Sequence, residues 1–313
     1  MRMTWLVCGW LALGLPVMAE EKPVYFAGKG AVSPEQLLAV LKAQKLAGVA
    51  GELAKQLVPG VRLTGAGNAL VVKATNSKFG GVPALPARVE WPSWSGTNLM
   101  FLAQVNLKEL QAATPRAELP GTGLLLFFYD LNQSTAGFDP KDKGSWRVIY
   151  TDGETAPARW PAKLPAEARL KEAALRFQAV PTLPVVAQKV AGYEELDAKL
   201  QERFDAIVYE YLERNKPMHQ LLGNAVPIQG DNMPLECQLV SNGLYCGDGT
   251  GYNDPRAEKL GAGAKDWVLL AMIDTDEPRG WMWGDGGCLY FWIRQEDLKA
   301  RRFENVWMIS QCY

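Results

Sequence analysis

The chain has 313 residues, of which 48% are hydrophobic and 21% are charged, an ordinary composition for one large globular domain or two fused halves. Lysine and arginine number 33 and aspartate and glutamate 34, so the net charge is −1. A chain this close to neutral has no long-range attraction for phosphate or for an anionic membrane surface. It also lacks the dense basic run that is typical of nucleic-acid binding, so we expect no nucleic-acid partner.

Residues 1–19 are predicted to form a cleaved signal peptide. Arg2 supplies a positive start, an apolar stretch follows from Trp5 to Val17, and Val17-Met18-Ala19 is a small-residue cleavage signature. The apolar stretch is shorter than the roughly 20 residues that span a bilayer. Cleavage would leave a periplasmic or secreted protein without stable membrane insertion. An uncleaved anchor is the alternative.

Two amphipathic helices are predicted. The first covers residues 33–58, where Ser33 is a suitable N-cap, Pro34 occupies the first helical position and Gln36 completes a capping box. The second covers residues 193–216, with an apolar stripe opposite a charged face, and the following proline ends it.

Most other apolar runs are typical of strands, because they are short, rich in β-branched and aromatic residues, and bounded by turn residues. These runs are Ala69–Lys73, Leu99–Val105, Leu124–Tyr129, Trp146–Tyr150, Trp267–Ile273, Leu289–Ile293 and Val306–Ser310. A proline-rich stretch over residues 155–165 is predicted to be an extended connector.

Two parts of the chain resemble each other. Residues 98–109 (NLMFLAQVNLKE) are similar to residues 266–277 (DWVLLAMIDTDE). After a gap, residues 121–129 (GTGLLLFFY) are similar to residues 284–292 (GDGGCLYFW). The shared order and the glycine-rich turns favour an internal duplication over chance similarity between apolar strands.

The predicted fold is therefore α+β, a duplicated antiparallel β-rich motif with two or more flanking helices. Residues 20–313 would form a single domain made of two similar halves, at about residues 60–180 and 217–313.

Several separated motifs occur in an order that a known family shares. They are Lys78–Pro83 with Trp91-Pro92, Phe101–Leu107 leading to Leu124–Tyr129, His219–Gly223, Ile228–Asp231 and Trp283–Ile293. With these motifs the chain resembles the YwqG-like family of unknown function, over about Phe79 to Tyr313. The resemblance implies an α+β fold with a duplicated β-rich motif and implies no reaction. Many relatives look cytosolic, so the leader is a departure.

Four cysteines would remain after cleavage, and an even count in an oxidising compartment permits two disulfides. Residues 241–243 (SNG) form a turn signal, so Cys237 and Cys246 are predicted to face each other across a hairpin. Cys288 and Cys312 lie in two strand-like runs and could bridge them. Four buried free thiols are the alternative.

The sequence lacks the motifs of several cofactor and enzyme classes. A single histidine, His219, excludes a His-rich zinc, copper or iron centre, and neither a phosphate-binding loop nor a nucleophile elbow occurs. We expect no metal and no cofactor. His219 could act as a general base, but no partner triad is visible, and we interpret it as a residue that caps the preceding helix or holds a loop.

The remaining candidates are polar or aromatic residues in loops. Asp231, with Gln229 in the same loop, and Asp285 are flanked by glycine, so they could bind a ligand or act as an acid/base pair, or simply stabilise turns. Trp281 and Trp283 precede a strand and are expected at the surface, where they could stack on a sugar or anchor a protein.

An acidic loop contains Asp274, Asp276 and Glu277. A calcium ion would need six or more oxygen ligands, and the spacing fits no EF-hand loop. We therefore interpret these residues as solvated turn charges.

Two functions are consistent with these features. The preferred one is an exported, cofactor-free binding or interaction protein that captures a partner, for example as a toxin-neutralising (immunity-like) protein of the cell envelope. The alternative is a hydrolase that acts on cell-envelope material with loop carboxylates. Convergence of His219, Asp231 and Asp285 in one cleft would favour the hydrolase, and separate positions in turns would favour binding.

Overall fold

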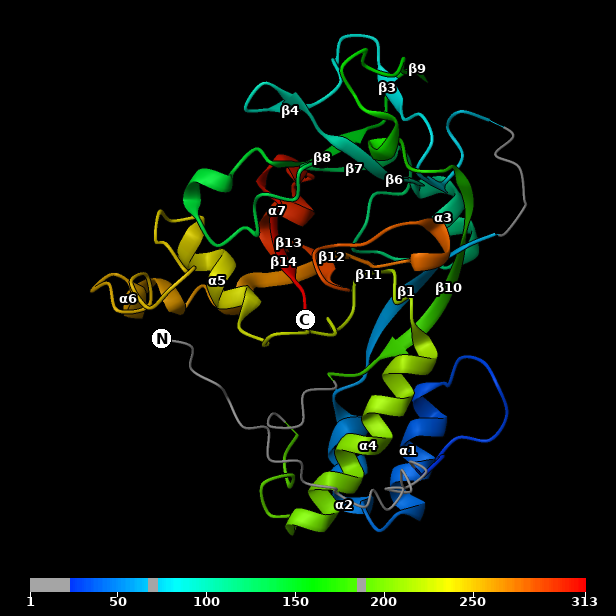
Figure 1. Ribbon diagram of the computed structural model, residues 1–313, viewed down its shortest axis with the longest axis vertical. Coiled ribbons are helices and arrows are strands. Elements are labelled where there is room, and N and C mark those ends of the chain that lie inside the picture. The colour runs from blue at the N-terminus through cyan, green and yellow to red at the C-terminus, as the bar shows by residue number, and fades with distance from the viewer. Residues whose placement is uncertain (1–22, 67–72, 185–189) are drawn as a thin grey trace, which may run out of the picture.

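The computed structural model describes residues 23–66, 73–184 and 190–313, so the predicted signal peptide, residues 1–19, lies outside the described residues. Its body is built on ten strands, β1 (Val58–Gly65), β2 (Lys78–Phe79), β6 (Met100–Asn106), β7 (Leu124–Tyr129), β8 (Trp146–Thr151), β10 (Ala173–Thr182), β11 (Gln220–Leu221), β12 (Trp267–Asp274), β13 (Cys288–Arg294) and β14 (Trp307–Gln311). They form one antiparallel sheet in the order β14-β13-β12-β11-β1-β10-β2-β6-β7-β8 (Figure 1). The mixed helix-and-sheet class predicted from the sequence is thus confirmed.

Six predicted strands correspond to β6, β7, β8, β12, β13 and β14, within one residue at most ends. The seventh, Ala69–Lys73, lies almost wholly outside the described residues. The two central strands, β1 and β10, were not predicted. Each contains a proline, and β10 carries polar residues along its length, so neither has the apolar run that marks a strand.

The described residues contain seven α-helices. They are α1 (Pro34–Ala43), α2 (Ala47–Lys55), α3 (Leu107–Ala113), α4 (Ala198–Asn215), α5 (Met233–Val240), α6 (Ala257–Gly261) and α7 (Gln295–Lys299). The capping box of Ser33 and Gln36 is present at the start of α1. The single helix predicted over residues 33–58 is instead two helices, because Lys45 takes a left-handed conformation (φ 67°) between them.

Helices α1, α2 and α4 form a separate layer, here called the helical unit, below the sheet (Figure 1). Their apolar stripes share one core, which includes Leu37 and Leu41 of α1, Leu53 of α2 and Phe204 and Ile207 of α4. The paired strands β1 and β10 lead from this unit into the middle of the sheet. No helix among the described residues has both the length and the apolar character that crossing a membrane requires.

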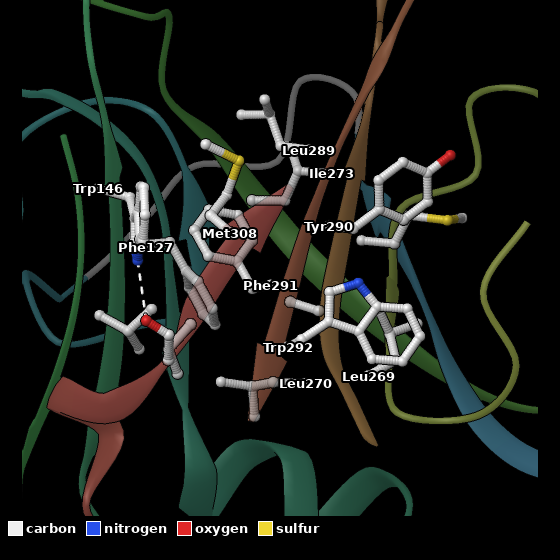
Figure 2. Packing of buried hydrophobic residues seen from close by; sticks show 14 of the residues in the cluster. Phe127, Trp146, Leu269, Leu270, Ile273, Leu289, Tyr290, Phe291, Trp292 and Met308 are labelled. Atoms are coloured by element: carbon white, nitrogen blue, oxygen red, sulfur yellow. Dashed lines mark hydrogen bonds between the residues drawn. The ribbon is translucent and has the colours of Figure 1, made fainter. Parts of the chain in front are cut away.

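The sheet curls until its two ends pack face to face and is nearly closed. Figure 2 shows Phe127 of β7 pointing at Phe291 of β13, and their ring centroids are 5.3 Å apart. Trp146 at the start of β8 packs against Trp307 of β14, with 5.0 Å between ring centroids. The Trp146 Nε1–H also donates to the Val306 carbonyl at 2.9 Å. Aromatic packing therefore joins the β6–β8 side of the sheet to its β12–β14 side.

The two sides of the sheet share local details. Strand pair β6–β7 has a register shift at residues 101–103, and strand pair β12–β13 has one at residues 269–271. These are equivalent positions of the two similar segments. Strands β2 and β11 are each followed by two residues with positive φ, at 80–81 and at 222–223.

All four described cysteines are unbonded, so the predicted disulfides are wrong. The alternative of four buried free thiols holds for three of them, whereas Cys312 is half-buried. The expected hairpin does not form, because Cys237 lies in helix α5. On the sheet, Cys288 is opposite Gln311, not Cys312. Cys312 follows the end of β14, and its Sγ lies close to Gly284.

Candidate functional site

His219 lies just before β11 and is almost fully buried, with 2% of its surface exposed. The backbone N–H of Asp274 donates to its Nδ1 at 3.1 Å. With Nδ1 as an acceptor, the Nε2–H faces the Asp276 carboxylate, 3.3 Å away. Both ring nitrogens are therefore engaged within the protein.

The same structural role is filled on the other side of the sheet by a serine. The Ser77 hydroxyl, just before β2, accepts from the backbone N–H of Asn106 at 2.8 Å. Asn106 ends β6 as Asp274 ends β12. This correspondence identifies the Nδ1 atom of His219 as an acceptor that secures the end of a strand. Of the two structural roles predicted from the sequence, the ring does not cap the preceding helix, whereas its contact with Asp276 agrees with holding a loop.

The Asp276 carboxylate also meets Arg279, which belongs to the short 3₁₀ helix Glu277–Arg279. The Arg279 Nε atom is 2.7 Å from Asp276 Oδ2, although its N–H is not aligned for a hydrogen bond. The guanidinium lies directly over Gly65 at the end of β1, since a Cβ added there would stand 1.9 Å from Arg279 Nη2. A glycine is thus needed for the Arg279 side chain to lie flat on this strand.

These residues line a cavity of about 850 Å³ between the helical unit and the sheet, here called the helix–sheet groove. Its walls come from the start of α1, the end of α4, strands β1 and β10, and the loop after β12. Its ionisable or polar lining side chains include Glu35, Arg62, Tyr211, Arg214, Lys216, His219, Asp276 and Arg279. Among the described residues, four cations and two carboxylates therefore line the groove.

Arg62 projects from β1 into the groove and is half-buried. Its Nη1 donates to the Asn215 carbonyl at 2.9 Å, while its Nε is buried without a hydrogen-bond partner. Burial lowers the pKa of Arg62 from its ordinary value, and the nearby Tyr211 and Asp274 only partly offset this. A poorly hydrated guanidinium of this kind gains from an incoming anion.

The other cations of the groove are more fully occupied. Arg214 donates to the carbonyls of Phe26, Gly28 and Gly30, and Lys216 is 2.7 Å from Glu213. Arg62 is consequently the cation best placed to take a ligand, because Arg279 is itself paired through Nε, 2.7 Å from Asp276 Oδ2, and has its Nη atoms left to offer.

The interpretation of the acidic loop as solvated turn charges is wrong for two of its members, because Asp274 is 7% exposed and Asp276 is 4% exposed. The Asp274 carboxylate accepts from the Met218 N–H at 2.8 Å, and burial raises the pKa of Asp274. Burial would also raise the pKa of Asp276, but the hydrogen bond from His219 and the charge of Arg279 outweigh it and lower that pKa.

The lowered pKa of Asp276 predicts an acid-dependent loss of stability. Its contribution is complete above the unfolded value of about 3.9 and disappears as pH falls through the folded pKa. Urea unfolding should therefore show a wild-type advantage over Asp276→Asn that is largest near about pH 6 and shrinks toward about pH 3. An advantage that stays constant across this range would contradict the assignment.

Of the predicted site residues, all of which the structure describes, only His219 lines the groove. The loop of Gln229 is held through backbone N–H groups that donate to Gln311 Oε1, at 2.8 and 3.2 Å. Gln229 is exposed, Asp231 is half-buried near α5, and Asp285 is exposed in a turn whose carbonyl accepts from the Tyr313 N–H. Asp231 and Asp285 do not join His219 in this cavity.

The expectation that Trp281 and Trp283 are surface residues is wrong, since each is 1% exposed. The loop folds inward: Trp281 packs on Phe79 and His219, and the Trp283 Nε1–H donates to the Asp274 carbonyl at 3.0 Å. Large indole rings gain more from burial than from a position in water, even in a loop. The Trp281 ring thereby packs on His219, a residue that lines the helix–sheet groove.

Among the described residues, no three His, Cys, Asp or Glu side chains are grouped so that they could hold a metal ion.

The chain can be placed among known proteins by one match. No curated protein is similar enough to match the chain. Residues 77–312 match a family described as a domain of unknown function, DUF1963. The match includes His219, Asp276 and Arg279, whereas Arg62 and Gly65 on β1 precede it. Because the match covers most of its length, the chain belongs to the DUF1963 family.

Proposed function

We propose that this protein is an exported binding protein that captures the acidic group of a small molecule in the helix–sheet groove. The observation that carries the proposal is Arg62, a groove-lining arginine whose buried Nε has no hydrogen-bond partner, with Arg279, whose Nε is ion-paired to Asp276, as a second guanidinium in the same groove. Arginine presents a planar fork of donors that matches carboxylate and phosphate oxygens. The volume of about 850 Å³ lies within the usual range for small-molecule sites.

The state of His219 supports binding over catalysis. A general base needs a nitrogen that is free to accept a proton from the substrate, and here Nδ1 already accepts from the Asp274 N–H. The loop carboxylates Asp231 and Asp285, which the hydrolase alternative requires, do not line the groove. Export rests on the leader pattern of residues 1–19. In a toxin-neutralising role, an acidic side chain of the captured toxin would occupy the groove in place of a small molecule.

The first test measures the binding of citrate and inorganic phosphate to the mature chain by isothermal titration calorimetry. We expect at least one of the two to bind, with its affinity lowered about 10- to 100-fold in Arg62→Gln, since a lost charge-assisted hydrogen bond costs about 1.5–3 kcal/mol. The matched control is Arg256→Gln, which removes an exposed arginine outside the groove and should change nothing. Equal affinities in the two variants would contradict the proposal.

Gly65→Ala tests the second arginine without removing it. The φ of Gly65 is not in the left-handed region, so alanine fits the backbone, but its Cβ would displace the Arg279 guanidinium. We expect anion affinity to fall about tenfold while the cooperative unfolding transition is retained. Gly51→Ala, in helix α2 with open space around it, is the control that should leave affinity unchanged. Undiminished affinity in Gly65→Ala would remove Arg279 from the site.

We also infer that the chain belongs to the YwqG-like group and that its sheet arose by internal duplication. The motif order from Lys78 to Ile293 supports the first inference. Three features support the second: the equivalent register shifts at 101–103 and 269–271, the positive-φ pairs at 80–81 and 222–223, and the matching roles of Ser77 and His219. Superposition of residues 98–129 on residues 266–292 tests the duplication, which fails if the strands do not coincide.

A further inference from the structure

A second cavity, of about 580 Å³, lies where the start of β1 meets the loop after α3 and helix α7. We call it the α7 pocket. Its lining comes from the start of β1, residues 116–120 and 222–223, the start of β12, and helix α7 with the turn that follows it. It shares no residue with the helix–sheet groove, so a ligand in the α7 pocket and an anion in the groove would not compete for the same side chains.

The interior of the α7 pocket is apolar. Leu119, Leu222, Leu269 and Leu298 line it and are themselves buried, so they present a rigid aliphatic surface. Val58 is 42% exposed, although it is a large apolar residue. An aliphatic chain that enters the pocket would remove this surface from water.

The charged residues of the pocket are mostly cations. Arg116, Lys299 and Arg301 line the pocket together with a single carboxylate, that of Glu118. Glu118 is already paired with Arg116, at 2.8 Å from Nη2. The Arg116 side chain is 10% exposed, and its Nε is buried without a hydrogen-bond partner. The pocket therefore combines an aliphatic interior with an excess of positive charge.

We propose that the α7 pocket binds a single-chain aliphatic carboxylate of the fatty-acid class. The chain would occupy the leucine-lined interior, and the carboxylate would meet Arg116, Lys299 or Arg301. The excess of positive charge disfavours a cationic amphiphile, and a volume of about 580 Å³ suits one chain better than the two chains of a phospholipid.

Binding of octanoate, decanoate and dodecanoate to the mature chain tests the proposal by calorimetry below their micelle concentrations. Each buried CH₂ should increase the affinity about fourfold until the pocket is full. Dodecyltrimethylammonium, which has the same chain length and the opposite charge, should bind at least tenfold more weakly than dodecanoate. Affinity that is independent of chain length, or equal for the two head groups, would overturn the proposal.

Substitutions at two exposed lining residues test whether the ligand binds in the α7 pocket, and they leave the core unchanged. Lys299→Glu should lower dodecanoate affinity about tenfold, whereas Lys265→Glu makes the same charge change outside the pocket and should have no effect. Val58→Asp should lower it further, because a charge would stand among the aliphatic contacts. Binding that survives Lys299→Glu and Val58→Asp would place the ligand elsewhere. Arg62→Gln should leave dodecanoate binding intact, which separates this test from that of the groove.

A vesicle arm separates free carboxylates from membranes. If the protein sediments with phosphatidylglycerol vesicles but does not bind monomeric dodecanoate, the residues around the α7 pocket recognise a bilayer. That result would overturn the proposal.

Discussion

His219→Ala is expected to lower the free energy of unfolding by about 3 kcal/mol, measured by urea denaturation followed by tryptophan fluorescence. The substitution leaves the buried N–H of Asp274 without an acceptor and the Asp276 carboxylate without the Nε2–H. It also removes a ring that packs between Phe79 and Trp281, with 4.7 and 5.8 Å between ring centroids. Each loss alone costs about 1–3 kcal/mol.

His219→Asn is the matched control. The asparagine Oδ1 is positioned like Nδ1 and can still accept from the Asp274 N–H, but the side chain cannot reach Asp276 as Nε2 does. We expect it to recover about half of the stability that His219→Ala loses. A His219→Ala protein as stable as the wild type would show that the ring is dispensable to the fold and would reopen a catalytic role.

Phe291→Ala should cost about 3–5 kcal/mol, the usual range for a fully buried phenylalanine. Phe291 of β13 has no exposed surface and meets Phe127 of β7 across the core, so the truncation leaves a cavity between the two sides of the sheet (Figure 2). The midpoint of thermal or urea unfolding measures the effect.

Met282→Ala is the control for Phe291→Ala, because its side chain is 47% exposed and should change stability by less than about 0.5 kcal/mol. If Phe291→Ala costs no more than Met282→Ala, the two sides do not pack as described. Phe127→Ala combined with Phe291→Ala should cost less than the sum of the two single changes, since the rings share one contact.

The outer strands of the sheet were predictable because each is a short apolar run with clear turn residues at its ends, as in Leu124–Tyr129. The central strand β1 was not predictable, because Val58-Pro59-Gly60 is a pattern typical of the end of a helix. Its strand structure depends on hydrogen bonding to β10, more than 100 residues later in the chain. Single-sequence patterns carry no information about such distant pairing.

The site was even less predictable than the fold. His219 was recognised as the only histidine, but its partners Asp276 and Arg279 were hidden in a charged loop that resembles a solvated turn. Arg62 is an isolated arginine among apolar residues, and Gly65 has no role until Arg279 lies over it. The one available signal was the charged residue at position 62 within an apolar run. Burying a charge costs free energy unless the charge is paired with a partner or a ligand.

The tryptophan prediction failed for a related reason. A position in a loop before a strand favours a surface location for Trp281 and Trp283. The loop folds back over the sheet and is held by Gln133 from the other side, which donates to the Met282 carbonyl at 3.0 Å and accepts from the Gly284 N–H at 2.9 Å. Glutamine side chains that bridge distant loops leave no sequence pattern.

The most direct test of the central claim, that His219 serves the fold and leaves the arginines to bind the ligand, is the nitrogen NMR spectrum of the imidazole in the mature chain. The chain has one histidine, so its two ring nitrogens are assigned without ambiguity. We predict that near neutral pH Nε2 carries the proton and Nδ1 does not, and that a bound anion leaves both signals in this state. A protonated Nδ1, or a ring proton that moves when the anion binds, would contradict the account.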